Sequence, residues 1–542
     1  MEGIYLTLLI FLPVAGAALT ALVPASNPKA ARMLGMAVLT LNLLICIGLW
    51  ARFDNTTTDL QFMTRIVWIR SFNIEYFTGV DQISFWMVVL TGVVAFVAGL
   101  SSLSIEKNVR GYWAMYLLLN AGMYGVFVAM DFFLFYIFWE VMLLPMYFLI
   151  GIWGGPRKEY AAIKFFLYTL AGSVFMLLCL IALYYGSDAK PLIEKFPELA
   201  IGGQKALENG MFVLADGTTS AHTFNLFYIT KLAHTGHWAA QAPILGIAFT
   251  KIVWVALFIG FAIKVPMFPF HTWLPDAHVE APTPVSAILA GVLLKMGTYG
   301  ILRFNFGILP DATVWAADAM AVFGVINIVY AAFVCLAQKD LKKIIAYSSV
   351  SHMGFVLLGF AALTKQGMAG AYFQMISHGI VSPLLFLCVG VIYDRAHTRD
   401  VEAFGGLAQK MPEYAAITGL AFFASLGLPG LAGFIGEALV FLGSFQKYTV
   451  FTMISVSSVI ITAAYYLWTM QRVFLGKFNA VWEGHLPPLT ARERIILYPL
   501  CAGTIILGVF PMFIFDHMNE GLYALVDVTT ETASMIGKMA GL

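Results

Sequence analysis

Residues 243–270 read PILGIAFTKIVWVALFIGFAIKVPMFPF, and this stretch contains the features that decide the fold. A helix that crosses the hydrocarbon core of a bilayer needs about 20 mainly apolar residues, and 243–265 supplies such a run. Lys264 stands inside the run, and Pro266 and Pro269 follow directly, where they forbid a continuous helix. The stretch therefore predicts a membrane-spanning helix that is interrupted beside a buried charge.

Apolar runs of the same kind recur along the whole chain of 542 residues. The sequence is 60% hydrophobic and 11% charged, whereas soluble proteins carry about 45–50% apolar and about 25% charged residues. We therefore expect an all-α polytopic membrane protein with about fourteen transmembrane helices, of which 243–265 is the seventh. The first run lacks a preceding basic segment, so we expect a span rather than a cleaved signal. The other runs lie at roughly 3–22, 31–50, 83–104, 112–130, 132–152, 160–185, 284–304, 314–336, 343–363, 368–393, 414–443, 449–475 and 494–515.

Basic residues in the loops between these runs predict the orientation of the chain. Lys and Arg gather in the loops after odd-numbered runs, whereas the short loops after even-numbered runs hold only Arg303, Lys365 and Lys447. Because loops rich in Lys and Arg stay in the cytoplasm, both termini are expected outside. The longer polar stretches 51–82 and 186–242 then also lie outside, and we expect the second to be a plain loop or a partner contact.

Ionisable residues inside the apolar runs are the most informative, because each costs about 2.5–3.5 kcal/mol to insert into a membrane. Lys164 and Lys251 stand near the ends of their runs and could reach water by snorkelling, whereas the mid-run charges cannot. A string of Glu, Lys and His on successive helices suits proton relay, since a carboxylate tunes a buried lysine and histidine exchanges protons near neutral pH. Static ion pairs that hold helices together are the alternative. The candidate relay residues are Glu140, Lys264, Lys295, His352, His378 and Glu437.

A second interruption suggests that the chain consists of two similar halves. The sequence GLPG at 427–430 stands shortly before Glu437, within the twelfth run. Paired interrupted helices are the best sequence pointer to an ion site in an inverted-repeat transporter, although a kink with only a packing role is the alternative. We expect two inverted five-helix repeats with discontinuous helices 7 and 12. The predicted division is 1–110 for the first three spans, 111–305 for the first repeat, 306–480 for the second repeat, and 481–542 for the last span and tail.

Other kinds of chemistry are disfavoured by what the sequence lacks. The five cysteines form no CxxC pair, so neither an iron–sulfur cluster nor a zinc ion has a ligand set. GxGxxG, HExxH and GxSxG motifs are missing too, so we expect neither NADH binding nor hydrolase chemistry in this chain. A formal net charge of +1 argues against a nucleic-acid partner.

Six short motifs are distinctive: FWEVMLLPMY at 138–147, KVP at 264–266, HTWLPDAH at 271–278, APTPVS at 281–286, YSSVSHMG at 347–354 and HTRD at 397–400. Together they resemble the antiporter-like subunits of respiratory complex I, over about residues 80–475. Subunits of multisubunit cation/proton antiporters and of membrane-bound hydrogenases share the plan. The resemblance implies a subunit of a proton-translocating NADH:quinone oxidoreductase, that is, a translocase chain without a redox centre.

The resemblance also implies a role for each charged residue. Glu140 would tune Lys264, which would be loaded from the cytoplasm, and Lys295 would pass charge along the membrane midplane. The two candidate histidines would then bridge to Glu437, the terminal station near the external exit. Most relatives carry a lysine at that last position, and a glutamate is implied for one of the three related complex I subunits.

Partners and location follow from the same resemblance. Other membrane-arm subunits of complex I, above all the two related antiporter-like chains, would adjoin this chain in the lipid bilayer. Flavin, iron–sulfur clusters and quinone would lie in partner subunits, and quinone reduction there would drive proton movement here. A bacterial inner membrane with both termini on the periplasmic side is favoured over the mitochondrial inner membrane. A subunit of a multisubunit cation/proton antiporter and a passive scaffold with static ion pairs stay open as alternatives.

Overall fold

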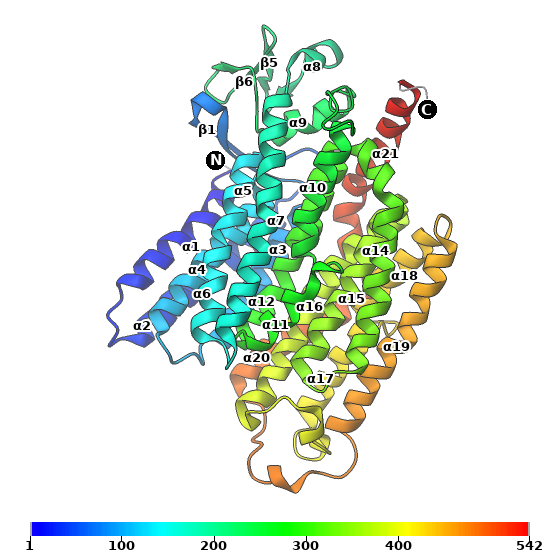
Figure 1. Ribbon diagram of the computed structural model, residues 1–542. Helices are drawn as coiled ribbons and strands as arrows, with labels where there is room; N and C mark the ends of the chain where they lie inside the picture. Colours follow the sequence, from blue (N-terminus) through cyan, green and yellow to red (C-terminus); the bar gives the residue numbers. More distant parts are fainter. Residues whose placement is uncertain (1–2, 540–542) are drawn as a thin grey trace.

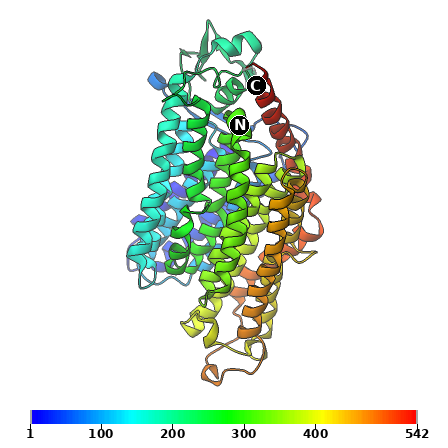
Figure 2. The same ribbon diagram turned by 45° about the vertical axis from the view of Figure 1, so that its right-hand side comes forward.

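The computed structural model describes residues 3–539 as a bundle of helices with a small strand-bearing cap at one end (Figure 1). A view turned by 45° shows most of the helices running side by side along the long axis (Figure 2). The first helix begins, and the last helix ends, toward the end of the bundle that carries the cap. The first three helices are α1 (Ile4–Leu22), α2 (Pro28–Trp50) and α3 (Phe85–Ser102).

The predicted first repeat consists of helices that are cut into short pieces. Its helices are α4 (Val109–Val128), α5 (Phe132–Val141), α6 (Leu143–Trp153), α7 (Lys158–Gly186), α10 (Phe249–Lys264), α11 (Trp273–Glu280), α12 (Thr283–Ile288) and α13 (Leu294–Gly300), with π-helical segments at Leu289–Leu293 and Ile301–Phe306. α10 ends at Lys264 just before Pro266, which confirms the predicted break. A second break at Met142 was not predicted. Pro145 has no N–H to donate to the carbonyl of Val141, so α5 and α6 part there.

The predicted second repeat has longer helices and one sharp interruption. Its helices are α14 (Pro310–Leu336), α15 (Leu341–Ala362), α16 (Lys365–Ala396), α17 (Pro412–Ser425), α18 (Ala432–Phe445) and α19 (Thr449–Val473), and α20 (Ala491–Val509) and α21 (Met512–Met539) follow. Gly427 and Gly430 adopt φ values of +81° and +89° between α17 and α18. Such left-handed backbone favours glycine, because other residues pay for the contact between Cβ and the backbone. The second predicted break is thus confirmed.

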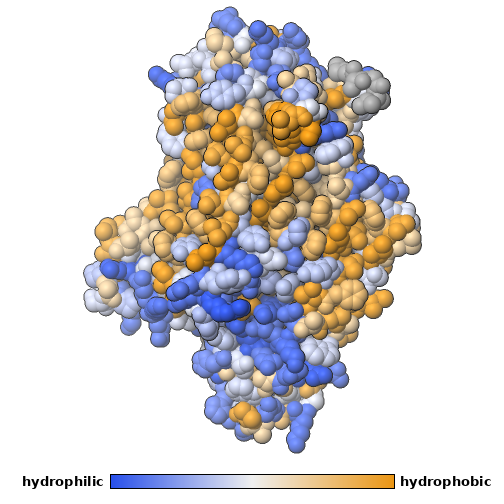
Figure 3. Space-filling model, viewed as in Figure 1, coloured by the Kyte–Doolittle hydropathy of each residue, from blue (hydrophilic) through white to orange (hydrophobic). Residues whose placement is uncertain are grey.

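Membrane-spanning character is clear from length and composition. Each of the fourteen apolar runs falls on helical segments. Within residues 3–539, ten helices are long and apolar enough to cross a membrane, or up to eleven if the bent pair α20–α21 is one span. The broken α10, α17 and α18 are too short to qualify alone and α4 is not among the ten, so the number fourteen stays a prediction. Figure 3 shows a broad apolar band over the helices, with a polar region below it.

The cap at the upper end of Figure 1 is built from the two polar stretches before α3 and after α7. A hairpin of β1 (Gln61–Ile69) and β2 (Ile74–Val80) packs beside short strands and two helices. The remaining elements are α8 (Lys190–Lys195), β3 (Ala200–Ile201), β4 (Gln204–Lys205), β5 (Leu207–Glu208), β6 (Met211–Val213), β7 (Thr219–Ser220) and α9 (Leu226–Ala233). Residues 186–242 therefore form a folded unit rather than the plain loop that was one expectation.

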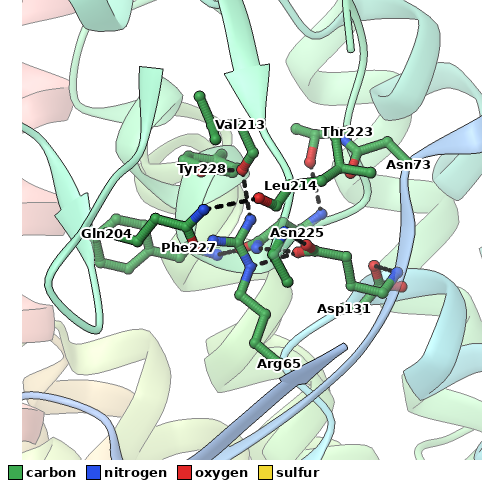
Figure 4. A network of polar contacts seen from close by, with 12 residues as sticks. Arg65, Asn73, Asp131, Gln204, Val213, Leu214, Thr223, Asn225, Phe227 and Tyr228 are labelled. Carbon is green, nitrogen blue, oxygen red and sulfur yellow. Dashed lines mark hydrogen bonds and ion pairs between the residues drawn. The ribbon is translucent and has the colours of Figure 1, made fainter. Parts of the chain in front are cut away.

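A buried carboxylate holds the cap together. Glu75 is fully buried on β2 and accepts hydrogen bonds from Arg65 at 2.8 Å, from the Asn225 side chain at 3.1 Å and from the backbone N–H of Ala215 at 2.8 Å. Its own N–H donates to Asp131, which also caps the start of α5. Figure 4 shows Arg65, Asn225 and Asp131 converging from the hairpin, the second polar stretch and the start of α5. The network thereby ties the cap to the helix that carries Glu140.

Candidate functional site

Four of the six candidate residues form a row that runs from the end of the predicted first repeat into the predicted second repeat. Lys295 on α13 is fully buried, and its Nζ lies 2.6 Å from Nδ1 of His378 on α16. The ring of His378 lies 5.5 Å, centroid to centroid, from that of His352 on α15. His352 Nδ1 in turn lies 3.2 Å from a carboxylate oxygen of Glu437 on α18. Four separate helices thus bring one lysine, two histidines and one carboxylate into a row.

The Lys295–His378 contact is suited to sharing a single proton. At 2.6 Å one of the two nitrogens must donate and the other accept, so one proton lies between Lys295 Nζ and His378 Nδ1. Lys295 Nζ also donates to the carbonyl of Ala290 at 2.6 Å, within the π-helical segment next to α13. His378 Nε2 has no partner within residues 3–539 and is free to donate or accept on its other side.

A small polar cavity lies beside His352 and His378. Its volume is about 10 Å³, which approaches the space that one water needs. His352 Nε2 lies 3.0 Å from the hydroxyl of Ser425, which lies 2.7 Å from the Tyr466 hydroxyl. Tyr466 donates to Ser348 at 3.0 Å. The row is therefore continued by hydroxyl groups that can accept and donate protons.

The broken helix positions Glu437 directly. Gly427 approaches the carboxylate so closely that a Cβ at this residue would lie 2.8 Å from Glu437 Oε2. A Cβ at Gly436 would lie 2.4 Å from Oε1 of Gln374, which is why α18 can pack against α16 here. Both glycines thus serve the close approach of the elements around Glu437.

The other two candidates form a separate, looser group. Lys264 is 1% exposed, and its Nζ has no hydrogen-bond partner in the described part of the chain. Its Nζ lies 4.7 Å from the ring centroid of Trp139, a favourable cation–π distance. Glu140 is close enough for its charge to act on Lys264, but the described residues show no direct ion pair between them.

The two groups lie on helices that pack closely against each other. A Cβ at Gly297 on α13 would lie 2.8 Å from the carbonyl of Phe261 and 2.9 Å from the N–H of Val265, next to Lys264. α13, which carries Lys295, therefore lies directly against the end of α10. The structure shows no contact between Lys264 and Lys295 themselves within residues 3–539.

The two lysines near span ends have structural partners. Lys164 donates to Asp276 at 2.8 Å at the end of the bundle opposite the cap. Lys251 Nζ lies 4.9 Å from the ring centroid of Trp315. These contacts fit the snorkelling expectation for both residues.

Comparison with known proteins shows the family to which this chain belongs. The model of the NADH:quinone oxidoreductase/Mrp antiporter transmembrane family matches residues 129–462, a stretch that contains all six candidate residues. The chain belongs to this family. It is 41% identical to NADH-quinone oxidoreductase subunit M of Rhodobacter capsulatus, with 96% of each chain covered. It is 36% identical to NADH-ubiquinone oxidoreductase chain 4 of Marchantia polymorpha, again with 96% of each chain covered.

Solved structures of the NADH:quinone oxidoreductase/Mrp antiporter family share the fold. A chain of respiratory complex I from Thermus thermophilus aligns with a TM-score of 0.80 and 26% identity, covering 98% of this chain and 100% of that chain. A chain of the Mrp complex from Dietzia sp. DQ12-45-1b aligns with a TM-score of 0.79 at 19% identity and 99% coverage of both chains. At 19% identity, the similarity to the Mrp chain shows only that the two chains share a fold.

Several polar features of this family member were not found from the sequence. Arg303 was read only as a loop residue, but it makes two hydrogen bonds of 2.7 Å to Asp81 and ties the π-helical segment after α13 to the start of α3. His278 and Lys342 are buried near the opposite end of the bundle. The HTWLPDAH motif could have pointed to His278, whereas Arg303 and Lys342 carry no comparable local signal. No group of metal-ligating side chains occurs between residues 3 and 539.

Proposed function

We propose that this chain is the M subunit of a proton-translocating NADH:quinone oxidoreductase and carries protons through its buried row of charges. The observation that carries the proposal is the row Lys295–His378–His352–Glu437, in which titratable side chains from four helices follow one another. The relatives named NADH-quinone oxidoreductase subunit M support the choice of complex. The translocase activity is assigned to this chain, and electron transfer to its partners.

The chemistry follows from the high cost of an uncompensated charge away from water. Adding a positive charge near Lys295 drives its proton toward the histidines, and the Glu437 carboxylate stabilises the cation that arrives at His352. Glu140 plays the corresponding part for Lys264 in the first group. Each residue then returns to its starting charge when the proton moves on.

The same proposal covers the partner subunits of the chain and its orientation in the membrane. The other membrane-arm subunits of complex I, including two related antiporter-like chains, would adjoin its apolar faces in the bilayer. Flavin, iron–sulfur clusters and quinone would be bound by partner subunits. The cap and both termini would face the periplasm of a bacterial inner membrane, and 111–305 and 306–480 would be the two inverted repeats.

The test is the number of protons pumped per electron by the assembled, reconstituted complex that carries Glu437→Gln. We expect this ratio to fall while NADH oxidation continues, because a glutamine side chain cannot hold a charge opposite His352. Lys251→Met is the matched control, since Lys251 is a lysine near a span end outside the row. An unchanged ratio in Glu437→Gln would support the passive scaffold instead.

A subunit of a cation/proton antiporter is the remaining alternative, because the Mrp chain has the same fold. It predicts that this chain functions without quinone reduction and that proton movement depends on sodium. The proposal predicts pumping in sodium-free buffer that stops when quinone reduction is inhibited.

A further inference from the structure

The ring of His352 contacts a short series of hydroxyl groups that ends at a backbone carbonyl. His352 Nε2 lies 3.0 Å from the hydroxyl of Ser425, the last residue of α17. That hydroxyl lies 2.7 Å from the hydroxyl of Tyr466 on α19, which donates to Ser348 at 3.0 Å. Ser348 donates in turn to the carbonyl of Ile345, about one turn earlier on α15, at 2.8 Å. The four side chains of the series are buried.

The direction of these hydrogen bonds follows from the last acceptor. A carbonyl oxygen only accepts, and each hydroxyl has a single proton to donate. The proton of Ser348 is used on the carbonyl, and the proton of Tyr466 is used on Ser348. Ser425 must therefore donate its proton to Tyr466, so it can only accept from His352. The series thus assigns a proton to Nε2 of His352.

The other ring nitrogen of His352 faces a carboxylate and an amide. Nδ1 lies 3.2 Å from an oxygen of Glu437 and 3.4 Å from the side-chain nitrogen of Gln374. With Nε2 already protonated, one proton can lie between Nδ1 and Glu437, either on the ring or on the carboxyl group. In the opposite neutral tautomer, the ring could take up a further proton only at Nε2, on the side facing Ser425. The break between α17 and α18 thus supplies a partner for each ring nitrogen.

We propose that Tyr466, acting through Ser425, is a positioning residue that holds His352 in the tautomer with a proton on Nε2. A proton that binds Nδ1 then leaves from Nδ1 to the Glu437 carboxylate, and the ring returns to the same tautomer without turning. Because the hydroxyl series ends at a carbonyl, it holds the Nε2 proton in place rather than passing it on. This role rests on the proposed function, in which His352 and Glu437 are neighbours in the row.

The experiment compares Tyr466→Phe with Tyr465→Phe in the assembled, reconstituted complex. Both substitutions remove one buried hydroxyl and keep the ring, but the Tyr465 hydroxyl has no hydrogen-bond partner within residues 3–539. In Tyr466→Phe, Ser425 can turn its proton toward Nε2 of His352, so the opposite tautomer becomes populated. We expect Tyr466→Phe to lower the protons pumped per electron, by less than Glu437→Gln does and with electron transfer retained. Tyr465→Phe should pump normally.

Redox-triggered infrared difference spectra of the same complexes, with histidine labelled in the ring, separate the tautomer from the packing. The ring-stretching band of neutral histidine differs between the two tautomers, and the band that His352→Gln abolishes belongs to His352. We expect the Nε2–H form in wild type and in Tyr465→Phe. Tyr466→Phe should shift the ratio of the two forms by about two- to tenfold, the effect of one hydrogen bond between neutral groups. Ser425→Ala should shift the band in the same direction, whereas Ser425→Thr retains a hydroxyl and should restore the Nε2–H form.

Any of three results would overturn the inference. An unchanged His352 band in Tyr466→Phe would show that the hydroxyl series does not set the tautomer. Equal pumping losses in the two tyrosine variants would assign the effect to packing. Normal pumping in Tyr466→Phe, beside a lowered ratio in Glu437→Gln, would remove Tyr466 from the mechanism and leave the proposed function standing. Normal pumping in Glu437→Gln would instead contradict the proposed function, and the His352 band would still decide the tautomer.

Discussion

The two halves of the chain place the same kinds of residue beside similar breaks but connect them differently. In the first half, Lys264 and Glu140 both have polar atoms without partners among the described residues. In the second half, His352 contacts Glu437 and Ser425 directly. The first half also carries the folded cap, whereas the second half joins its helices by short connections on that side. A helix break thus places a charge in the membrane, but the neighbouring helices decide whether it is connected to the next.

Under the proposed function, this difference predicts that the second half passes protons in the arrangement seen, whereas the first half needs Lys264 to gain a partner. A lysine without a hydrogen-bond partner is ready to change its charge when a partner moves toward it. A connected row passes a proton without a large rearrangement. Substitutions in each half test this difference.

The largest effect is expected from Glu140→Gln. The substitution removes the carboxylate whose charge acts on Lys264, so the first half can no longer be loaded. We expect pumping through this chain to be lost, at least about tenfold, with assembly retained, as measured by proton uptake in proteoliposomes. Glu159→Gln, at an exposed carboxylate on α7, is the matched control and should pump normally. Normal pumping in Glu140→Gln would mean that the two halves do not work in series.

A smaller effect is expected from Gly427→Ala in the second half. The added Cβ would lie 2.8 Å from Glu437 Oε2 and would have to displace the carboxylate from its place near His352. We expect pumping to fall about two- to fivefold and stability to fall by about 1–2 kcal/mol, since a non-glycine residue would occupy left-handed backbone.

The control for this substitution lies three residues away. Gly430 has φ +89°, and a Cβ there would meet nothing within 4 Å. Gly430→Ala should therefore show the same loss of thermal stability with normal pumping. Equal pumping defects in the two variants would show that backbone strain, rather than displacement of Glu437, is responsible.

The smallest effect is expected in the cap of the first half. Burial, followed by the charges of Lys231 and Lys195, lowers the pKa of His234 from 6.5 to about 4. Between pH 6.5 and about 4 the unfolded cap binds a proton that the folded cap does not, so this group makes the cap less stable as the pH falls through that window. We expect hydrogen-exchange protection of residues 186–242, corrected for intrinsic rates, to fall less between pH 7 and 5 in His234→Gln than in wild type.

Much of this arrangement could be predicted from the sequence, because hydropathy and proline act locally. The apolar runs located the helices, and Pro266 and the GLPG segment located the two main breaks. The candidate charges were identified because each stands inside an otherwise mainly apolar run. What could not be predicted depends on contacts between distant segments. The pairing of Lys295 with His378 joins residues 83 apart, and the Glu75–Asn225 bond in the cap joins residues 150 apart.

Other features escaped detection for a different reason. The π-helical segments on either side of α13 leave no mark in the hydropathy pattern. His278 belongs to a recognisable motif, but its lack of partners becomes visible only when Phe386 is seen to cover the ring.

The central claim is that Lys295 and Glu437 belong to one proton route. The most direct measurement is the number of protons pumped per electron in Lys295→Leu, in Glu437→Gln and in the double variant, with NADH oxidation followed in parallel. Residues that act in one route are not additive, so we predict that the double variant pumps as much as either single variant. A double variant that loses the sum of the two single losses, or single variants that pump normally, would contradict the account.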